Sequence, residues 1–243
     1  MIPRFALIAL ALFTTVSTGF AADAPPKPAT ADKPPAKPEP GAAAVRKEMM
    51  PVADVAGLPR VLLIGDSISI GYTLPVRDLL KGKANVHRNL DPYNGETSRN
   101  GVKSLDKWLG DAKWDVIHFN HGLHDIKVMA GDVRQVELDE YEKNLRAIVA
   151  RLKKTGAKLI FATTTPVPEG KVSPARVPAD VVKYNEVAVK VMKEEGVAVD
   201  DLYAVAQPKL KEIQLSVNVH FNKKGSQLLA EQVAKSIEEA LKK

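Results

Sequence analysis

Residues 61–69, with the sequence VLLIGDSIS, decide the fold of this chain. A short apolar run ends in Gly65-Asp66-Ser67, and an amphipathic, helix-like pattern follows from Gly71 to Leu80. The pattern predicts a strand, a sharp turn and a helix, with Ser67 in the turn. Asp and Ser are both good helix caps, and capping is the simpler interpretation of this pair. A serine at the carboxyl end of a parallel strand, however, also stands where open α/β sheets bind their ligands.

Apolar runs alternate with amphipathic stretches from Arg60 onward. The apolar runs predict strands at residues 60–64, 84–87, 115–120, 158–162 and 197–199. The amphipathic stretches predict helices at residues 71–80, 98–109, 138–153, 179–195 and 223–241. In the fourth of these helices, Val182, Val189 and Met192 are the expected apolar face. Strands that alternate with helices imply right-handed crossovers, so we expect a flavodoxin-like three-layer α/β/α sandwich with a five-stranded parallel sheet.

The first 59 residues differ in composition from the rest. Residues 1–22 have one basic residue, Arg4, then an apolar run and a group of small residues, which predicts a secretory signal peptide. Residues 23–59 begin with a stretch rich in Pro, Ala and Lys, which predicts an extended linker. We therefore expect a signal peptide at 1–22, a disordered linker at 23–59, a folded domain at 60–243, and a secreted or periplasmic protein. An uncleaved N-terminal anchor is the alternative.

Composition limits the partners of this chain of 243 residues, which has a formal net charge of +6 and no cysteine. Stability must come from the core, since no disulfide can form. Basic residues are dispersed among acidic ones and are not interleaved with aromatic residues, which argues against a nucleic-acid partner. We expect a monomer with no stable membrane insertion once the signal peptide is removed.

Polar groups that suit catalysis follow the predicted strands. Gly95 follows the second strand, His124 follows the third, and His220 precedes the last helix. In a doubly wound sheet these loops and Ser67 open on the same edge. A hydroxyl, a glycine amide, a polar donor and a histidine at one edge suit acyl transfer, in which the serine attacks and the histidine accepts its proton.

Four motifs in this order resemble those of the SGNH (GDSL) hydrolase family over residues 60–243. They are GDSI at 65–68, GET at 95–97, GLHD at 122–125 where the family has Gly-x-Asn-Asp, and His220 in place of the terminal Asp-x-x-His block. The resemblance implies a serine esterase in which Ser67 is the nucleophile and His220 the base. It also implies an oxyanion hole made by the amides of Ser67 and Gly95 and by the His124 side chain. Neither a metal nor a cofactor is implied, and the expected substrate is a small-molecule or glycan ester.

His124 is the first departure from the family pattern. A neutral imidazole can donate one N–H in place of the asparagine amide, provided that a neighbour fixes its tautomer. Asn120 could be that neighbour, because it shares a strand face with His124 if the extended geometry continues. Asn120 is also the alternative side-chain donor to the oxyanion.

Val217 is the second departure, since it stands where the family has the aspartate that orients the histidine. Valine cannot accept the Nδ1–H of His220, so we expect a main-chain carbonyl near Val217 to accept it, which would leave a Ser67–His220 dyad. Asn218 stands where the family often has glycine, and asparagine tolerates a left-handed backbone. Asp201, a further acid, is expected to start a short helix.

Two other groups of residues are candidates for the site. His118, His121, His124 and Asp125 are near one another in sequence, but strand alternation separates His121 from the other two histidines, and we expect no shared metal ion. Residues 166–178 form a long proline-rich loop, which is expected to form one wall of the substrate site or to be a surface loop. If it forms that wall, Lys171 or Arg176 could contact a polar ligand.

The sequence therefore predicts an exported serine esterase that acts on short acyl groups, such as O-acetyl groups of carbohydrate. The predicted loops contain few large apolar residues, which argues against a deep slot for a long acyl chain. Two alternatives stay open. A non-catalytic carbohydrate-binding protein on the same fold is favoured by the two departures at His124 and Val217, and an esterase of lipid acyl chains keeps the chemistry but changes the substrate.

Overall fold

The computed structural model describes residues 46–90 and 95–242. The chain divides into two units, Met1–Ala43 and Ala44–Lys243. The first unit lies outside the described residues, and with it the expected signal peptide and most of the expected linker. Within the described residues, no helix has both the length and the apolar character needed to cross a membrane.

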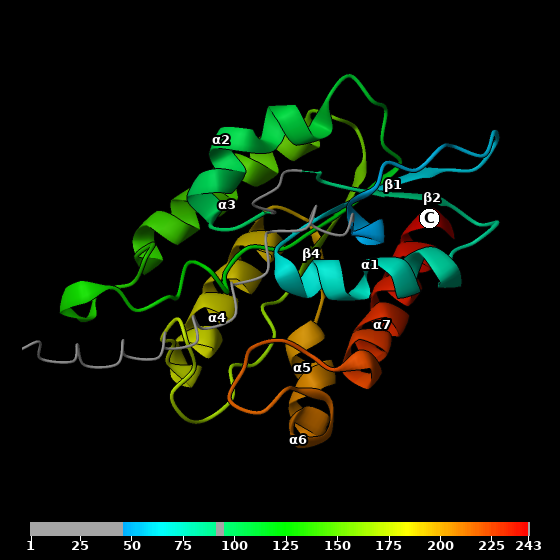
Figure 1. Cartoon of the computed structure of the whole chain (residues 1–243). Helices are drawn as coiled ribbons and strands as arrows, with labels where there is room; N and C mark the ends of the chain where they lie inside the picture. The colour runs from blue at the N-terminus through cyan, green and yellow to red at the C-terminus, as the bar shows by residue number, and fades with distance from the viewer. Residues whose placement is uncertain (1–45, 91–94, 243) are drawn as a thin grey trace, which may run out of the picture. The chain divides into compact units, whose positions relative to one another are not determined.

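A parallel sheet of five strands lies at the centre of the second unit, in the order β2-β1-β3-β4-β5 (Figure 1). The strands are β1 Arg60–Ile64, β2 Asn85–Arg88, β3 Val116–Phe119, β4 Lys158–Ala162 and β5 Ala198–Asp200. Residues of β1 and β3 are almost wholly buried, as strands covered by helices on both faces must be. The expected three-layer α/β/α sandwich with a five-stranded parallel sheet is confirmed.

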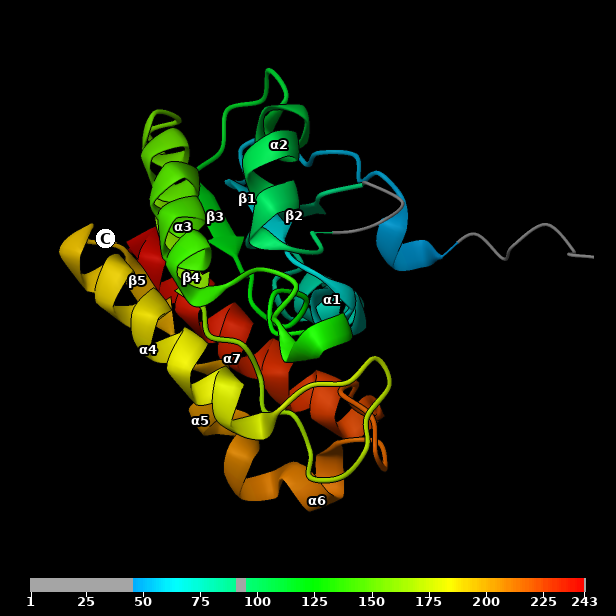
Figure 2. The ribbon, with the colours of Figure 1, turned by 90° about the vertical axis from the view of Figure 1, so that its left-hand side faces the viewer.

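Two layers of helices cover the sheet (Figures 1 and 2). One layer contains α2 (Ser98–Leu109), α3 (Leu138–Lys153) and α4 (Pro178–Glu194), which pack side by side. The other contains α1 (Ser67–Leu79), α7 (Lys223–Lys242) and the short α5 (Leu202–Ala206). Shorter pieces complete the described elements: α6 (Leu210–Ile213) and the 3-10 turns η1 (Lys47–Met49), η2 (Ala130–Asp132) and η3 (Gln207–Lys209).

The start of α1 differs from the expectation and matters for the site. The helix begins at Ser67 rather than at Gly71, because the side chain of Asp66 accepts a hydrogen bond from the amide of Ile68 at 2.9 Å. Asp66 is therefore the N-cap, and Ser67 is the first helical residue. This geometry places Ser67 directly at the carboxyl end of β1.

The buried face of α4 also differs from the expectation. Val182 and Val189 are 40% and 38% exposed, although Met192 is buried as expected. The buried stripe runs instead through Val181, Tyr184, Ala188 and Val191. Helix α4 therefore has two apolar stripes. Tyr184, which packs against Tyr141 of α3, lies on the buried one.

Residues 46–59 belong to the folded unit, which therefore starts before the expected boundary at residue 60. The backbone of Val55 exchanges two hydrogen bonds with the side chain of Asn85 in β2, at 2.9 and 3.0 Å. Asp54 also binds His87 of the same strand at 2.6 Å. The part of the predicted linker nearest the domain thus covers the edge strand β2.

Candidate active site

Ser67 and His220 are far apart in the sequence, and the fold brings them together. The Oγ of Ser67, at the start of α1, lies 2.8 Å from the Nε2 of His220, which precedes α7. Helices α1 and α7 are neighbours in the same layer, so their N-terminal ends meet at one edge of the sheet. The hydroxyl and the imidazole are within the distance that proton transfer from a serine requires.

Asn218 orients the imidazole of His220. Its Oδ1 lies 2.7 Å from Nδ1 of His220 and also accepts a hydrogen bond from the main-chain amide of His220 at 2.9 Å. Since that amide can only donate, the oxygen of the Asn218 side chain must face it, and His220 Nδ1 must then carry a proton to bind the same oxygen. The lone pair of Nε2 is therefore directed at Ser67. The expected main-chain acceptor near Val217 is replaced by this side chain.

The loop before His220 is held in a compact turn. The amide of Leu215 donates to the carbonyl of His220 at 2.9 Å, and the amide of Asn218 donates to the carbonyl of Leu215 at 3.2 Å. The positive φ of the turn, 48°, falls on Val217 and not on Asn218 as expected. A β-branched residue in this conformation is strained by roughly 1–2 kcal/mol. The turn nevertheless brings the Asn218 side chain within hydrogen-bonding distance of the His220 imidazole.

Gly95, an expected donor of the oxyanion hole, is hydrogen-bonded to the backbone at the end of β1. Its amide donates to the carbonyl of Gly65 at 2.8 Å, so that in this geometry it already has an acceptor. A Cβ atom at Gly95 would lie 2.9 Å from the same carbonyl group. Glycine is therefore needed here for the close approach of two backbones, at the end of β1 beside Ser67. The amide of Ser67 itself, as the first of α1, has no intrahelical acceptor.

His124 lies in a tight turn after β3, with Lys127 against it. The amide of Ile126 donates to the carbonyl of Gly122 at 3.0 Å, and Lys127 Nζ lies 3.0 Å from His124 Nδ1. Burial, together with the charges of Lys127, Arg176 and His220, lowers the pKa of His124 to about 4, while the charge of Asp66 opposes the shift. His124 is thus a neutral imidazole at neutral pH.

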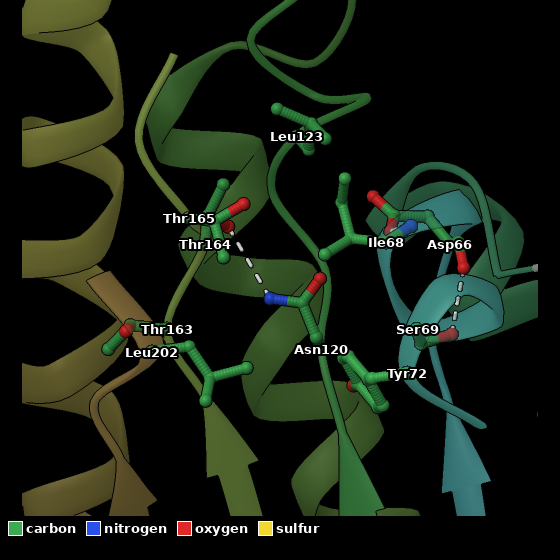
Figure 3. Close-up of a pocket in the computed structure, with 10 residues that line it drawn as sticks. All are labelled: Asp66, Ile68, Ser69, Tyr72, Asn120, Leu123, Thr163, Thr164, Thr165 and Leu202. Carbon is green, nitrogen blue, oxygen red and sulfur yellow. Dashed lines mark hydrogen bonds between the residues drawn. The ribbon is translucent and has the colours of Figure 1, made fainter. Parts of the chain in front are cut away.

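Asn120 faces the interior and not an open site. Figure 3 shows its side chain turned toward Thr164. Asn120 lines a small internal void of about 10 Å³ together with Asp66 and Ser69. Its Nδ2 donates to the carbonyl of Ala162 at 2.8 Å and contacts Thr164 Oγ1 at 3.5 Å. Its two amide hydrogens therefore have acceptors at the end of β4. Lys127, and not Asn120, is the neighbour of the His124 ring.

His118, in β3, and His121, just after it, have separate surroundings. His118 Nε2 binds Asp200 in the core at 2.9 Å, whereas His121 stacks on Trp108 of α2 and is 1% exposed. Among the described residues, no group of three His, Asp or Glu side chains could hold a metal ion.

Asp125 joins two of the site loops. Its Oδ1 accepts the amide and the hydroxyl of Ser98, the first residue of α2, at 2.9 and 2.5 Å. Burial raises the pKa of Asp125 to about 6, although the bonds from Ser98 oppose the shift. Asp201 caps α5 through the amide of Ala204, which confirms the expectation that it starts a short helix.

The 166–178 loop braces the turn of His124, and none of its residues lines the pocket at Ser67 and His220. Arg176 is 7% exposed, and its Nε donates to the carbonyl of Leu123 at 2.7 Å. The amide of Val128 donates to the carbonyl of Ala175 at 2.9 Å. Arg176 is therefore occupied by the backbone of its neighbours, whereas Lys171 is exposed.

An open pocket of about 680 Å³ begins at Ser67 and His220. Its floor is the apolar side of α1, from Ile68 to Pro75, and Phe221 lies beside His220. Polar side chains from η1 and α7 complete the lining: Arg46, Glu48, Lys223, Ser226 and Gln227.

The comparison with known proteins agrees with this geometry. The model of the GDSL-like lipase/acylhydrolase family matches residues 63–228, from within β1 to within α7. The chain belongs to this family. A GDSL esterase/lipase of Arabidopsis thaliana is 27% identical over 210 residues, which are 74% of this chain and 86% of the relative. The GDSL-family chain is accordingly a serine carboxylic ester hydrolase.

Solved structures with the same fold include two bacterial enzymes. A lipase/acylhydrolase from Enterococcus faecalis is 21% identical, with a TM-score of 0.63, over 75% of this chain and 96% of its own. An acetylxylan esterase from Geobacillus stearothermophilus is 21% identical, with a TM-score of 0.60, over 74% of this chain and 94% of its own.

Two residues at the site were not found by sequence reasoning, although each has a local signal. Asn218 stands two residues before His220, and asparagine often accepts the amide two residues ahead of it. Lys127 stands three residues after His124, a spacing that brings side chains together in a helical turn. Both signals are common in loops, and neither selects a catalytic role on its own.

Proposed function

We propose that Ser67 and His220 are the nucleophile and general base of this esterase, and that its substrates are short acyl esters, above all O-acetyl groups on carbohydrate. The observation that carries the proposal is the 2.8 Å approach of Ser67 Oγ to His220 Nε2, with Nδ1 of the same ring on Asn218. Asn218 supplies the orientation that an aspartate supplies in related enzymes, without its charge.

In the acylation step, Ser67 Oγ attacks the ester carbonyl carbon while its proton passes to His220 Nε2. The tetrahedral intermediate collapses, the C–O bond of the leaving alcohol breaks, and the alcohol oxygen takes the proton from Nε2. A water molecule then attacks the acyl-Ser67 ester, again with His220 as base. The carboxylic acid leaves and Ser67 recovers its proton.

The negative charge of the intermediate requires donors beside Ser67. We assign this role to the main-chain amide of Ser67 and to the side chain of His124. The Gly95 amide joins them only if it leaves the Gly65 carbonyl, to which it is bound at 2.8 Å.

The lining of the pocket supports a polar carrier for the acyl group. Charged and amide side chains at η1 and α7 line the pocket together with apolar side chains of α1, so that both the hydroxyl groups and the apolar face of a sugar ring could find partners there. The structural neighbour from Geobacillus stearothermophilus acts on acetylxylan, which gives the first substrate to try. The composition of residues 1–22 supports export, which secretion of the full-length precursor and sequencing of its mature N-terminus would test.

Hydrolysis of p-nitrophenyl acetate and release of acetate from acetylated xylan test the proposal. Ser67→Ala should lower kcat by about 10⁴-fold or more, since it removes the nucleophile. Ser104→Ala, on α2, is the matched control and should keep full activity. Equal rates for wild type and Ser67→Ala would contradict the assignment.

Two further measurements separate the alternatives. A fluorophosphonate should form an adduct on Ser67, and a protein that binds carbohydrate without catalysis would form none. In a series of p-nitrophenyl esters, the rate should be greatest at acetyl or propionyl; a maximum at long chains would identify a lipid acyl esterase.

A further inference from the structure

His124 and Lys127 are held against each other by the backbone. The turn after β3 is closed by bonds from Ile126 to Gly122 and from Lys127 to His124, at 3.0 and 3.3 Å. It places Lys127 Nζ 3.0 Å from His124 Nδ1, with the lysine half-buried. Arg176, in the 166–178 loop, donates to the carbonyl of Leu123 in the same turn.

The chemistry of the two groups fixes the direction of their hydrogen bond. An ammonium group has three donors and no acceptor, so Nδ1 of His124 must be the acceptor. A neutral imidazole has one proton, which must then be on Nε2. The ring is kept neutral at pH 7, since burial and the neighbouring cations lower its pKa to about 4.

We propose that Lys127 is a positioning residue that holds His124 in its Nε2–H tautomer and so maintains the side-chain donor of the oxyanion hole. This inference rests on the proposed function. An asparagine at this position would need no such help, because its amide always carries its hydrogens on nitrogen. A histidine needs a neighbour that selects one of two tautomers, and Lys127 is the side chain in hydrogen-bonding range of Nδ1.

The ammonium group also strengthens the donor. A cation bound to Nδ1 draws electron density from the ring and makes the opposite N–H more acidic, and hence a better donor to an oxyanion. Arg176 adds a second positive charge within electrostatic range of the ring. The result is a neutral donor that is polarised by two cations.

Long-range ¹H–¹⁵N correlation spectra of protein labelled at histidine nitrogen, recorded at pH 7 without substrate, read the tautomer directly. Wild type should show His124 with its proton on Nε2. Lys127→Met removes the donor at similar side-chain length and should give a mixture of tautomers. Lys127→Arg keeps a donor and should restore the Nε2–H form. Lys171→Met, in the exposed part of the 166–178 loop, is the matched control and should leave the spectrum unchanged.

Kinetics on p-nitrophenyl acetate provide the second readout. Removal of one oxyanion donor lowers kcat by roughly 10²–10³-fold, and a ring that keeps the correct tautomer for part of the time should lose less, about tenfold. Lys127→Met should therefore lower kcat by about tenfold with little change in KM, and Lys127→Arg should recover most of the loss.

A proton on Nδ1 of His124 in the wild type would overturn the inference whatever the activity, and this measurement needs no folded variant. An unchanged tautomer in Lys127→Met would overturn it as well. If the tautomer follows Lys127 while Ser67→Ala is as active as wild type, the pairing stands and the proposed function fails.

Discussion

The two histidines at this site are the same side chain in opposite states. His220 binds an acceptor, Asn218, through Nδ1, so that its Nε2 carries a lone pair toward Ser67. His124 binds a donor, Lys127, through the same ring atom, so that its Nε2 carries a proton. One neighbour in each case decides whether the imidazole takes a proton or offers one. The comparison shows that the chemical role of a histidine at a site depends on the hydrogen-bond partner of its other ring nitrogen.

The surroundings of the two rings reinforce this difference. His220 is half-buried and opens on the pocket, whereas His124 lies beside two cations that disfavour its protonation. A general base must accept a proton during each cycle, and a donor must not change its state. Burial and charge thus suit His124 to the donor role proposed for it, and access to the pocket suits His220 to the proposed role of base.

Exchange of each histidine for asparagine gives the sharpest test of this comparison. His220→Asn removes the base and should lower kcat by about 10⁴-fold or more. His124→Asn keeps a neutral N–H donor and should stay within about tenfold of wild type, whereas His124→Ala should lose roughly 10²–10³-fold. Steady-state kinetics on p-nitrophenyl acetate provide the measurement, with circular dichroism to confirm folding. Similar losses for the two asparagine variants would mean that the rings do not differ in role.

The buried state of the neighbouring His121 predicts how stability depends on pH. Burial lowers its pKa from 6.5 to about 4. Above pH 6.5 neither the folded nor the unfolded form binds a proton at this ring, and below it only the unfolded form does. The free energy of unfolding should therefore fall by about 3 kcal/mol through this group as the pH drops from 6.5 to 4. Urea titrations across this range measure the slope.

His121→Gln provides the control for that slope, because glutamine does not titrate in this range. Its unfolding free energy should depend less steeply on pH between 6.5 and 4, whatever its value at pH 7. His124→Asn should flatten the curve further, since the pKa of His124 is lowered in the same direction. A slope that neither substitution changes would show that both rings are protonated in the folded protein at pH 5.

Asn218 carries the smallest of the expected effects. Asn218→Ala removes the acceptor of His220 Nδ1 and should lower kcat by about tenfold, the value of one hydrogen bond that orients a ring. Asn218→Asp adds a charge that stabilises the protonated imidazole and should raise kcat by a similar factor. An Asn218→Ala variant as active as wild type would show that the imidazole is oriented by other contacts.

The sequence predicted the architecture of this site better than its finest contacts. Ser67 and His220 could be placed at one edge of the sheet because parallel strands end together, and the apolar pattern of Arg60–Ile64 identified the first of these strands. The interaction of Asn218 with His220 could not be foreseen, because it depends on a positive φ at Val217, a conformation that valine disfavours. The sequence predicted Gly95 as a donor of the oxyanion hole, but the hydrogen bond that occupies its amide depends on the close approach of two loops.

The division between braced and exposed parts of the site has a consequence for how this enzyme can diversify. The groups for chemistry lie on turns that buried hydrogen bonds hold, such as those of Asp125 and Arg176. Pocket residues such as Arg46 and Lys223, in contrast, are exposed side chains on the outside of the fold. Surface substitutions usually change stability by less than about 0.5 kcal/mol. These exposed side chains can therefore be exchanged at little cost in stability, which would change the substrate without disturbing the residues proposed for catalysis.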